Sequence, residues 1–312
     1  MVNTSIELKN STIVIVGASS GFGRGAALEL ARQGANVVVA ARRTKLLDEL
    51  VAQIKGEGGD ALAVTADVSI PEDIEKLTQK ALDTYKSIDI WINNVGVGAL
   101  GYFWDIPIDV HARVVDVNLK GLIYGAHAAL RHFIAKGRGT LINVGSIDSE
   151  VPLALQNTYA ATKSAVLSLG KSLNEELRLS GYADSISVAT IMPWAVDTPW
   201  WTHAANYSGH APRMAGMDDP ELVVEAIVKA CTDPKEKIPV GPKATMSNIS
   251  HQLFPKIAEQ MSANISKKER DKAKTVGTTN GTLFSPMKKG AGMDGGIRER
   301  MKREDAQAPT EE

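Results

Sequence analysis

The amino-acid sequence predicts an α/β fold in a single domain, with a doubly wound parallel sheet and helices on both faces. Short β-branched runs, such as residues 13–16 and 37–40, alternate with longer segments whose apolar residues recur at helical spacing. The first run is apolar throughout, which is typical of a strand buried on both faces. The alternation continues to about residue 240, and no internal repeat interrupts it.

Each element follows from this pattern in chain order. Strands are expected at residues 13–16, 37–40, 61–64, 89–92, 140–144 and 185–191, with a short edge strand at 237–240. Helices are expected at residues 25–34, 46–54, 71–85, 109–135, 158–180 and 220–231. Gly34 is suited to cap the first helix, and Pro71 stands in the first turn of the third.

The pattern weakens after Pro242. Residues 245–265 carry an apolar stripe that predicts an amphipathic helix bent near Pro255. The stripe consists of Met246, Ile249, Leu253, Ile257, Met261 and Ile265. Packing against its own domain or a partner subunit is favoured over membrane-surface contact, because the lysines follow the stripe instead of flanking it. Residues 266–312 are polar, and we expect them to be mostly disordered.

Composition excludes several classes of protein. The 312 residues are 44% hydrophobic with a formal net charge of −1, so no nucleic-acid partner is expected. The single cysteine, Cys231, lies in an apolar stretch and is expected to be a buried hydrophobe instead of a reactive thiol. No signal peptide or transmembrane run is recognised, and a cytoplasmic protein is expected. No side chains have metal-ligand spacing.

A glycine-rich turn follows the first strand. Gly17, Gly21 and Gly23 stand where the chain passes from strand to helix. Glycine permits a tight turn there and lets the backbone approach a pyrophosphate, which the free N–H groups of a helix N-terminus then bind. In a strand–turn–helix unit, this arrangement predicts a Rossmann-type dinucleotide site.

The spacing G-x-x-x-G-x-G resembles the classical short-chain dehydrogenase/reductase (SDR) family, and the resemblance runs from about Ser11 to Gly241. Further motifs of that family stand in register. They are Asp67 and Val68, Asn93 to Gly96, Asn118, Ser146, the Tyr159 to Lys163 run, and Pro193 to Thr198. The resemblance implies an NAD(P)-binding catalytic domain over residues 1–244, with a substrate loop at about 194–219.

It also implies the residues that bind the cofactor. Asp67 and Val68 would hold the adenine, Asn94, Val95 and Gly96 would support the adenosine ribose, and Thr198 would bond the carboxamide or phosphates. The glycine turn would contribute Ser19, Ser20 and Phe22, and the substrate loop Pro193 and Val196.

Arg42 and Arg43 decide between the two nicotinamide cofactors. NAD-binding sites usually end the second strand with a carboxylate for the ribose hydroxyls, and this chain has none there. Two guanidiniums suit a 2′-phosphate, so NADP(H) is preferred and NAD(H) is the alternative. One of the two, Arg43 in particular, is also compatible with a solvent-facing position.

Tyr159 and Lys163 lie four residues apart on a predicted helix and therefore share one face. A nearby ammonium favours the phenolate, which would let the tyrosine exchange protons near neutral pH. The resemblance implies that Tyr159 is the general acid/base and that Lys163 also reaches the nicotinamide ribose. It further implies that Ser146 orients the substrate oxygen and that Asn118 organises a relay water. His111, His127 and His132 are read as structural or surface residues.

The sequence departs from the family pattern at Val16, Val95, Gly145 and Trp194. Trp194, Trp200 and Trp201 flank the expected substrate loop and suggest an aromatic rim, hence a fairly apolar ketone, aldehyde or secondary alcohol. The leading hypothesis is reversible NADP(H)-dependent carbonyl reduction. A catalytically silent NAD(P)-binding regulator or scaffold is the alternative, and an epimerase or dehydratase is less favoured. A homodimer or homotetramer is expected from the family.

Overall fold

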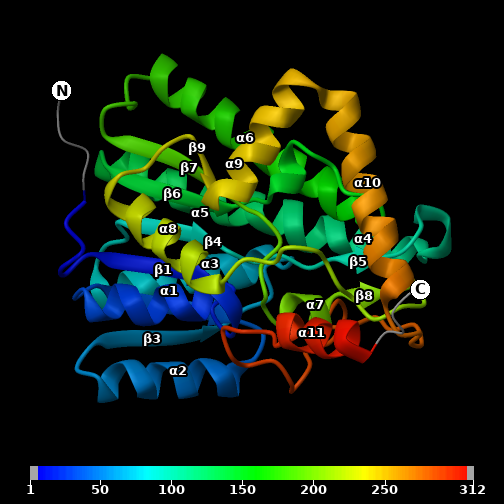
Figure 1. The fold of residues 1–312 in the computed structure, drawn as a ribbon. Helices are drawn as coiled ribbons and strands as arrows, with labels where there is room; N and C mark the ends of the chain where they lie inside the picture. Colours follow the sequence, from blue (N-terminus) through cyan, green and yellow to red (C-terminus); the bar gives the residue numbers. More distant parts are fainter. Residues whose placement is uncertain (1–5, 308–312) are drawn as a thin grey trace.

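A computed structural model describes residues 6–307 and contains a seven-stranded sheet in which every neighbouring pair is parallel (Figure 1). The strand order is β3-β2-β1-β4-β6-β7-β9. The strands are β1 Thr12–Val16, β2 Asn36–Ala41, β3 Asp60–Thr65, β4 Ile90–Asn93, β6 Gly139–Val144, β7 Ile186–Pro193 and β9 Lys237–Val240. The predicted fold class is confirmed, and each predicted strand overlaps an observed one.

The sheet is buried on both faces because alternate residues of its strands enter two separate cores. On β1, Ile13 and Ile15 join one core, and Val14 and Val16 join the other. All four side chains are at most 2% exposed. The continuous β-branched run that predicted this strand therefore reflects burial on both sides, as the sequence indicated.

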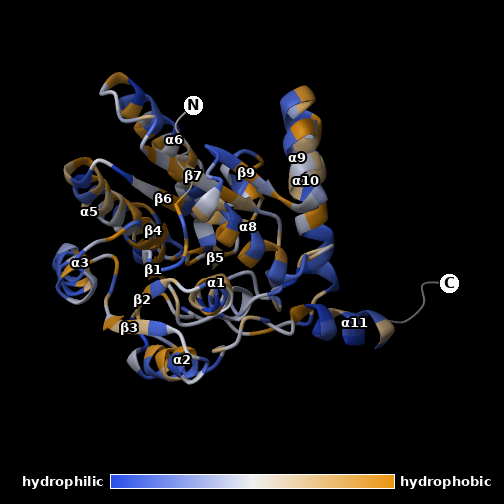
Figure 2. Ribbon diagram, turned by 90° about the vertical axis from the view of Figure 1, so that its left-hand side faces the viewer, coloured by the Kyte–Doolittle hydropathy of each residue, from blue (hydrophilic) through white to orange (hydrophobic). Residues whose placement is uncertain are grey.

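Helices cover both faces of the sheet (Figure 2). One face carries α1 Gly21–Arg32, α2 Thr44–Gly56 and α8 Pro220–Thr232, with α1 packed between the other two. The other face carries α3 Pro71–Tyr85, α5 Gly121–Lys136 and α6 Asn157–Leu179, and α4 Ile108–Val115 packs against α6. Cys231 in α8 is fully buried, and burial raises the pKa of its thiol, as suits an inert core residue.

The long helix predicted over residues 109–135 is interrupted. A π-helical turn, Asp116–Lys120, separates α4 from α5 and contains Asn118. Such turns are frequent at functional sites because the extra residue redirects the side chains around it. Two short strands also escaped the sequence analysis, β5 Ala99–Leu100 and β8 Ala205–Asn206, which pair in parallel beside α7 Trp200–His203.

The expectation of disorder after residue 266 is wrong for the part that the structure describes, up to residue 307. The predicted single helix is two helices, α9 Gly241–Leu253 and α10 Pro255–Lys272, which meet at Phe254. A further helix, α11 Ile297–Gln307, follows an irregular segment. Low aromatic content had suggested that this segment could not build a core of its own, but it packs on the main domain instead. Residues 308–312 lie outside the described part.

The apolar stripe on α9 and α10 faces outward. Met246, Leu253, Ile257 and Met261 are each more than half exposed, so the stripe does not pack against its own domain, and packing against a partner subunit stays a prediction. The inner face is made by Ala244, Asn248, Ser266 and Glu269, which are buried. The two helices form a hairpin in Figure 1, and in Figure 2 they lie to one side of the molecule.

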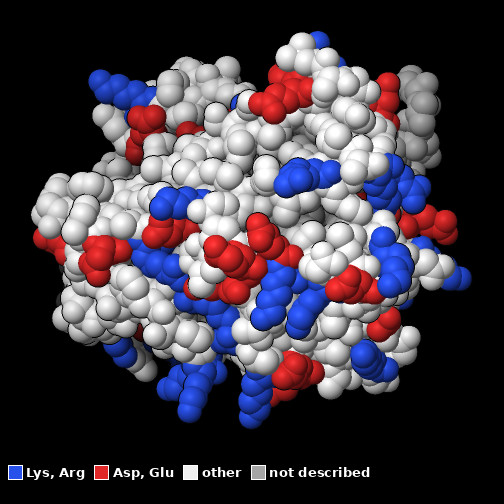
Figure 3. All heavy atoms as spheres, turned by 180° about the vertical axis from the view of Figure 1, so that it is seen from behind, with Lys and Arg blue, Asp and Glu red and all other residues white. Residues whose placement is uncertain are grey.

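Charges of both signs are interspersed over the surface opposite the view of Figure 1 (Figure 3). No helix between residues 6 and 307 is both long and apolar enough to cross a membrane. Within the same range, no group of three or more His, Cys, Asp or Glu side chains could hold a metal ion.

Candidate functional site

In the sheet, β2 and β3 lie on one lateral side of β1, and β4 and the later strands lie on the other. The strand order therefore reverses between β1 and β4. In open α/β sheets, ligands bind outside the carboxyl ends of the strands at this reversal. A cavity of about 250 Å³ lies there. Its walls include Gly17 after β1, Asn94 after β4, Ser146 after β6 and Thr198 after β7. The sheet topology therefore brings together motifs that are far apart in the sequence.

The glycine turn forms one wall of this cavity. Gly17 has a φ of +94°, and a Cβ there would lie 2.9 Å from the Val95 side chain. At Gly23, a Cβ would lie 2.4 Å from the Gly17 carbonyl oxygen. Gly23 is absent from the cavity lining, so its place is in the close packing behind the turn. Asn94 donates a hydrogen bond of 2.9 Å to the Gly17 carbonyl and fixes the turn to β4.

Arg42 and Arg43 lie at the adenosine end that the family resemblance implies, and both line the cavity. Arg43 donates to the hydroxyls of Ser19 and Ser20, at 2.9 and 2.6 Å. It therefore folds back over the glycine turn and does not point into solvent. Burial lowers the pKa of both guanidiniums, and the neighbouring charge of Arg42 lowers that of Arg43 further.

A third guanidinium joins this group. Arg113 in α4 donates to Asp67 at 2.7 Å and to Ser69 at 2.5 Å. Hydrogen bonds from Ser69 and Arg113 hold the pKa of the Asp67 carboxyl below its usual value although burial opposes this. Asp67 is thus already neutralised by Arg113, and it lies 4.0 Å from Arg42. Positive charge exceeds negative charge at this end of the cavity.

Ser146, Tyr159 and Lys163 meet at the opposite end and all line the cavity. The Lys163 ammonium lies 5.6 Å from the centroid of the Tyr159 ring and donates to the Val144 carbonyl at 2.7 Å. The Ser146 hydroxyl accepts from the Asp148 backbone N–H at 3.1 Å, and in this way it caps the short 3₁₀ turn Ile147–Ser149. Its own proton remains available to another acceptor.

Burial controls the ionisation of these groups. It raises the pKa of Tyr159, the charge of Asp148 raises it further, and Ser146 opposes both. Burial lowers the pKa of Lys163 to about 8, against the influence of Asp148. From the sequence we expect Lys163 to lower the tyrosine pKa, but in this structure the loss of solvation dominates. Tyr159 is therefore a protonated phenol at neutral pH.

Asn118 is buried and does not line the cavity. Its side chain accepts from the Val97 N–H and donates to the Val97 carbonyl, both at 2.8 Å, and it donates to Thr162 at 3.1 Å. The Asn118 amide thus ties Val97, in the segment after β4, to Thr162 in α6. Val97 lies two positions after Val95. The π-helical turn places this residue, which a regular helix through residues 109–135 would have aimed differently.

The three tryptophans also lie at the cavity, as the sequence suggested. Trp200 packs against Tyr159 with ring centroids 5.1 Å apart, and against Trp201 at 5.2 Å. Trp201 donates from its indole nitrogen to the Val196 carbonyl at 2.9 Å, so its place is fixed by the loop itself. Trp194 packs beside Ile147 and Val151.

The cavity also contains residues that the sequence analysis missed. Asp148 lines it from the 3₁₀ turn Ile147–Ser149, and nothing in the sequence around Ser146 signals this. Thr282 and Pro286 line it from the segment expected to be disordered. No pattern in that segment predicted the contact, because its hydrogen bonds use backbone carbonyls, which every sequence has.

Residues 281–296, here called the C-terminal strap, cross the adenosine end of the cavity. Arg42 donates to the Thr282 carbonyl at 2.5 Å and Arg43 to the Gly290 carbonyl at 3.1 Å. On the far side, the strap rests closely on the segment after β7. A Cβ at Gly281, whose φ is +53°, would lie 2.1 Å from the His203 carbonyl oxygen.

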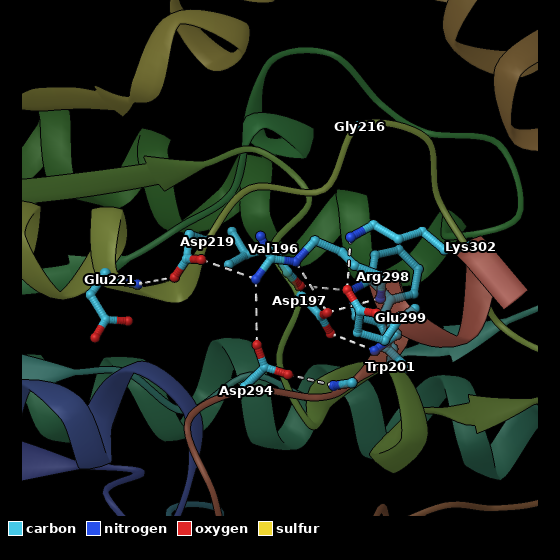
Figure 4. A network of polar contacts seen from close by, with 12 residues as sticks. Val196, Asp197, Trp201, Gly216, Asp219, Glu221, Asp294, Arg298, Glu299 and Lys302 are labelled. Carbon is cyan, nitrogen blue, oxygen red and sulfur yellow. Dashed lines mark hydrogen bonds and ion pairs between the residues drawn. The ribbon is translucent and has the colours of Figure 1, made fainter.

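Asp197 anchors the end of the strap (Figure 4). This buried carboxylate accepts from the backbone N–H groups of Ile297 and Arg298, at 2.8 and 2.9 Å, and so caps α11. The Arg298 guanidinium donates to Asp197 at 3.2 Å and also reaches Asp219 and Asp294. Because Asp197 precedes Thr198 in the motif after β7, the strap is attached directly to the wall of the cavity.

Comparison with known proteins agrees with this geometry. The family profile described as short chain dehydrogenase matches residues 11–207. The chain belongs to the short-chain dehydrogenase family. The "Uncharacterized oxidoreductase YxnA" of Bacillus subtilis is 36% identical over 83% of this chain and 73% of that protein. The "Uncharacterized oxidoreductase SH0585" of Staphylococcus haemolyticus is 33% identical over 73% of this chain and 94% of that protein.

Solved structures of related proteins share the fold. A 3-ketoacyl-(acyl-carrier-protein) reductase from Brucella melitensis complexed with NADH is 28% identical, with a TM-score of 0.63 over 77% of this chain and 94% of that one. An alcohol dehydrogenase from Thermococcus sibiricus complexed with 5-hydroxy-NADP is 25% identical, with a TM-score of 0.62 over 70% and 89%. This short-chain dehydrogenase is therefore an NAD(P)-dependent oxidoreductase.

The residues of this short-chain dehydrogenase fit a nicotinamide dinucleotide. Close approach at Gly17 and Gly23 keeps side chains out of the turn, as a pyrophosphate-binding turn requires. At the start of α1, the Gly21 N–H donates to the Gly292 carbonyl of the strap at 3.0 Å. The cavity extends without a break from Arg42 and Asp67 to Tyr159 and Lys163. A dinucleotide is the kind of ligand that needs both ends of such a cavity.

Proposed function

We propose that the protein reversibly reduces a carbonyl compound to an alcohol with NADP(H). The observation that carries this proposal is that Ser146, Tyr159 and Lys163 line the same cavity as the glycine turn. A bound dihydronicotinamide supplies the hydride in such a reaction. The chain's own residues then have to orient the carbonyl, hold a proton at its oxygen and exclude water.

Each residue suits one of these tasks. The Ser146 hydroxyl donates to the carbonyl oxygen, because its acceptor side is taken by the Asp148 N–H. Tyr159 gives its phenolic proton to the same oxygen, and its raised pKa keeps that proton in place at neutral pH. Lys163, held by the Val144 carbonyl, stabilises the phenolate that remains. Asn118 positions Val97, and the relay role implied by the family stays a prediction.

The excess of positive charge supports NADP(H) over NAD(H). The adenosine end holds three guanidiniums, from Arg42, Arg43 and Arg113, and one carboxylate, Asp67, which interacts with Arg113 and Arg42 only. Burial without a matching carboxylate lowers the pKa of Arg43, which means that an added anion would be favourable there. A 2′-phosphate supplies that anion and accepts charge-assisted hydrogen bonds from both arginines.

The cavity wall favours a fairly apolar substrate. Leu153, Met214 and the rings of Trp194, Trp200 and Trp201 surround the space beside Tyr159. Aromatic and thioether surfaces stabilise ligands mainly by excluding water. A ketone, aldehyde or secondary alcohol with an apolar body fits this wall better than a small charged metabolite.

We also propose that two copies pair through α5 and α6. An apolar groove between these helices is lined by Ile123, Leu130, Ile134, Leu169 and Leu173. Ile123 and Ile134 are 41% and 37% exposed, and a second copy would cover them. A cytoplasmic location suits the single cysteine, which is buried and unpaired.

The proposed function is tested with purified protein and a panel of carbonyls and alcohols, following NADPH or NADH absorbance. We expect turnover of apolar ketones or aldehydes with NADPH. Tyr159→Phe should abolish turnover while NADPH binding, followed by fluorescence, stays within about threefold. A biological role that survives in Tyr159→Phe would instead support the regulator or scaffold alternative.

Arg42→Ala tests the cofactor preference. We expect the ratio of NADPH to NADH affinity to fall at least about tenfold, because one charge-assisted contact to the 2′-phosphate is lost. Using the ratio removes any effect of the strap that is common to both cofactors. Arg178→Ala, at an exposed ion pair on α6, is the control and should leave the ratio unchanged. An unchanged ratio in Arg42→Ala would contradict the NADP assignment.

A further inference from the structure

Four residues that line the cavity carry a buried polar side-chain atom with no hydrogen-bond partner among the described residues. One is the side-chain oxygen of Asn94, whose amide nitrogen donates to Gly17 in the glycine-turn wall. The other three lie toward Ser146 and Tyr159, and they are one carboxylate oxygen of Asp148 and the indole nitrogens of Trp194 and Trp200. Buried polar atoms in native proteins are almost always hydrogen-bonded, so an unpaired set carried by residues that line one cavity points to a ligand with matching polar groups.

Asp148 is the most unusual of the three. Its side chain is buried, with the residue only 1% exposed, yet no donor of the described chain reaches Oδ1. The cap of the local turn is made by the Ser146 hydroxyl, so the carboxylate is not needed there. Lys163 is the cation whose charge acts on Asp148, but its ammonium donates to the Val144 carbonyl. A structural role therefore leaves this carboxylate unexplained.

The three indoles at the cavity differ in whether their N–H is hydrogen-bonded. Trp201 donates to the Val196 carbonyl, as expected for a buried indole that only supports the fold. Trp200, packed between Tyr159 and Trp201, keeps its N–H unpaired, and so does Trp194. Two donors and one acceptor thus remain in a wall that is otherwise formed by aromatic rings, Leu153 and Met214.

We propose that Asp148 anchors the substrate, and that the substrate is an apolar carbonyl compound carrying a hydrogen-bond donor, either a hydroxyl or a protonated amine. The Trp194 and Trp200 indoles donate to the oxygen of such a hydroxyl or to the substrate carbonyl region, whereas an ammonium group has no lone pair and meets the carboxylate alone. This inference rests on the proposed function, because it names the substrate class of that site. It also narrows the substrate class. The apolar body of the substrate contacts the aromatic rings, and its one hydrogen-bond donor contacts the Asp148 carboxylate.

The position of Asp148 relative to Ser146 supports an anchor near the reacting carbon. The two residues are separated by one residue, and their backbone and hydroxyl are joined by the 3.1 Å hydrogen bond. A substrate whose carbonyl oxygen meets Ser146 and Tyr159 therefore has its nearest substituents beside Asp148. Donors one or two carbons from the carbonyl are the ones within reach.

A matched series of aryl alkyl ketones tests the proposal. The ketones carry hydrogen, hydroxyl, methoxy or ammonium on the first or second carbon from the carbonyl. For whichever of the hydroxyl and ammonium ketones the wild-type protein reduces faster, kcat/KM should exceed that of the matching methoxy ketone by about 10- to 100-fold. The methoxy group cannot donate, so the hydrogen bond to a buried charge is lost. The hydroxyl and ammonium members distinguish the two donor types.

Asp148→Asn should reduce the preference for the ammonium ketone over its methoxy partner to within about threefold. Asp148→Leu should do so for both the ammonium and the hydroxyl ketone. Asp184→Asn, a change at an exposed carboxylate, is the control and should keep the wild-type preference. Retention of the preference in both Asp148 variants would overturn the proposal. So would equal use of hydroxyl and methoxy ketones by the wild type.

Calorimetric binding of the same ketones separates this inference from the proposed function. If no ketone is reduced with either cofactor, the proposed function fails, but the difference in affinity between hydroxyl or ammonium and methoxy ketones still reports on Asp148. If ketones are reduced and bind without regard to the donor, the proposed function stands and the Asp148 anchor is wrong. The isosteric Asp148→Asn variant keeps the test open should Asp148→Leu not fold.

Discussion

The Lys163 ammonium lies 5.6 Å from the centre of the Tyr159 ring, yet it donates to the Val144 carbonyl and not to the phenol. Burial lowers the pKa of Lys163 to about 8 and raises the pKa of Tyr159. The two groups thus hold one proton on the phenol and an ammonium nearby, which is the arrangement that a proton donor to a developing alkoxide requires.

Lys163→Met is expected to lower kcat/KM for carbonyl reduction by about 10² to 10⁴, the range of a lost acid–base contribution. The variant loses the cation that would stabilise the phenolate after proton transfer. Steady-state kinetics at pH 7 measure the effect. Lys171→Met, two turns later on the same helix and exposed, is the matched control and should retain activity within about twofold. Equal loss in both variants would point to damage to α6 instead of the chemistry.

Asp148 is expected to make the cofactor-free protein less stable as pH rises. Burial raises the pKa of its carboxyl to about 7, with Lys163 opposing, whereas the value in an unfolded chain is about 3.9. The folded state binds this proton more tightly, so the stability from this group is complete below about pH 4 and is lost as pH rises toward about 7. Tyr159 and Lys163 are the other titratable groups coupled to it.

Thermal unfolding between pH 5 and pH 8 measures this effect. Asp148→Asn removes the titration, so its Tm should rise relative to the wild type as pH increases across that range. Asp184→Asn should follow the wild type at every pH. A constant difference between Asp148→Asn and wild type would show that the carboxyl does not titrate differently in the two states.

Gly125→Ala is expected to lower the free energy of unfolding by about 1–3 kcal/mol, because overpacking a buried polar cluster forces it to shift. A Cβ at this position in α5 would lie 2.4 Å from the Asn93 side-chain oxygen and 2.9 Å from the Trp91 indole nitrogen. Those two atoms form a 2.8 Å hydrogen bond. Urea unfolding measures the change. Gly56→Ala, where no atom lies within 4 Å of the added carbon, should be neutral or slightly stabilising.

Arg298→Ala is expected to release the C-terminal strap. It removes the guanidinium that joins Asp197, Asp219 and Asp294, while the backbone cap of α11 by Asp197 remains. Limited proteolysis should cut within residues 281–296 at least about tenfold faster than in the wild type. Lys302→Ala, at an exposed ion pair on the same helix, is the control and should not change the cleavage rate. Equal rates for all three proteins would mean that Arg298 does not hold the strap.

The central sheet could be predicted from the sequence because its strands obey a local rule. A strand buried on both faces must be apolar throughout, as at residues 13–16, and the glycine turn has few explanations other than close approach. Motif register indicated Ser146 and Tyr159, the missing carboxylate after the second strand indicated Arg42, and the cluster of tryptophans indicated Trp200. Arg42, Ser146, Tyr159 and Trp200 were all expected at the site, and all line the cavity.

What could not be predicted depends on contacts between distant segments. The strap is held by backbone carbonyls that meet Arg42 and Arg43, and these leave no signature in composition. The ionisation of Tyr159 follows from burial, which the i, i+4 spacing to Lys163 does not report. Asp148 was overlooked because a single acid after a strand is usually a turn residue, and only the cavity shows that its carboxylate is unpaired.

The C-terminal strap also imposes an order on biosynthesis. Residues 11–207, which the family shares, leave the ribosome before residues 281–296, and α11 can be capped by Asp197 only after both have emerged. Until then the adenosine side of the cleft stays open to solvent. The cover over the adenosine end is therefore the last part of the cavity wall to be made.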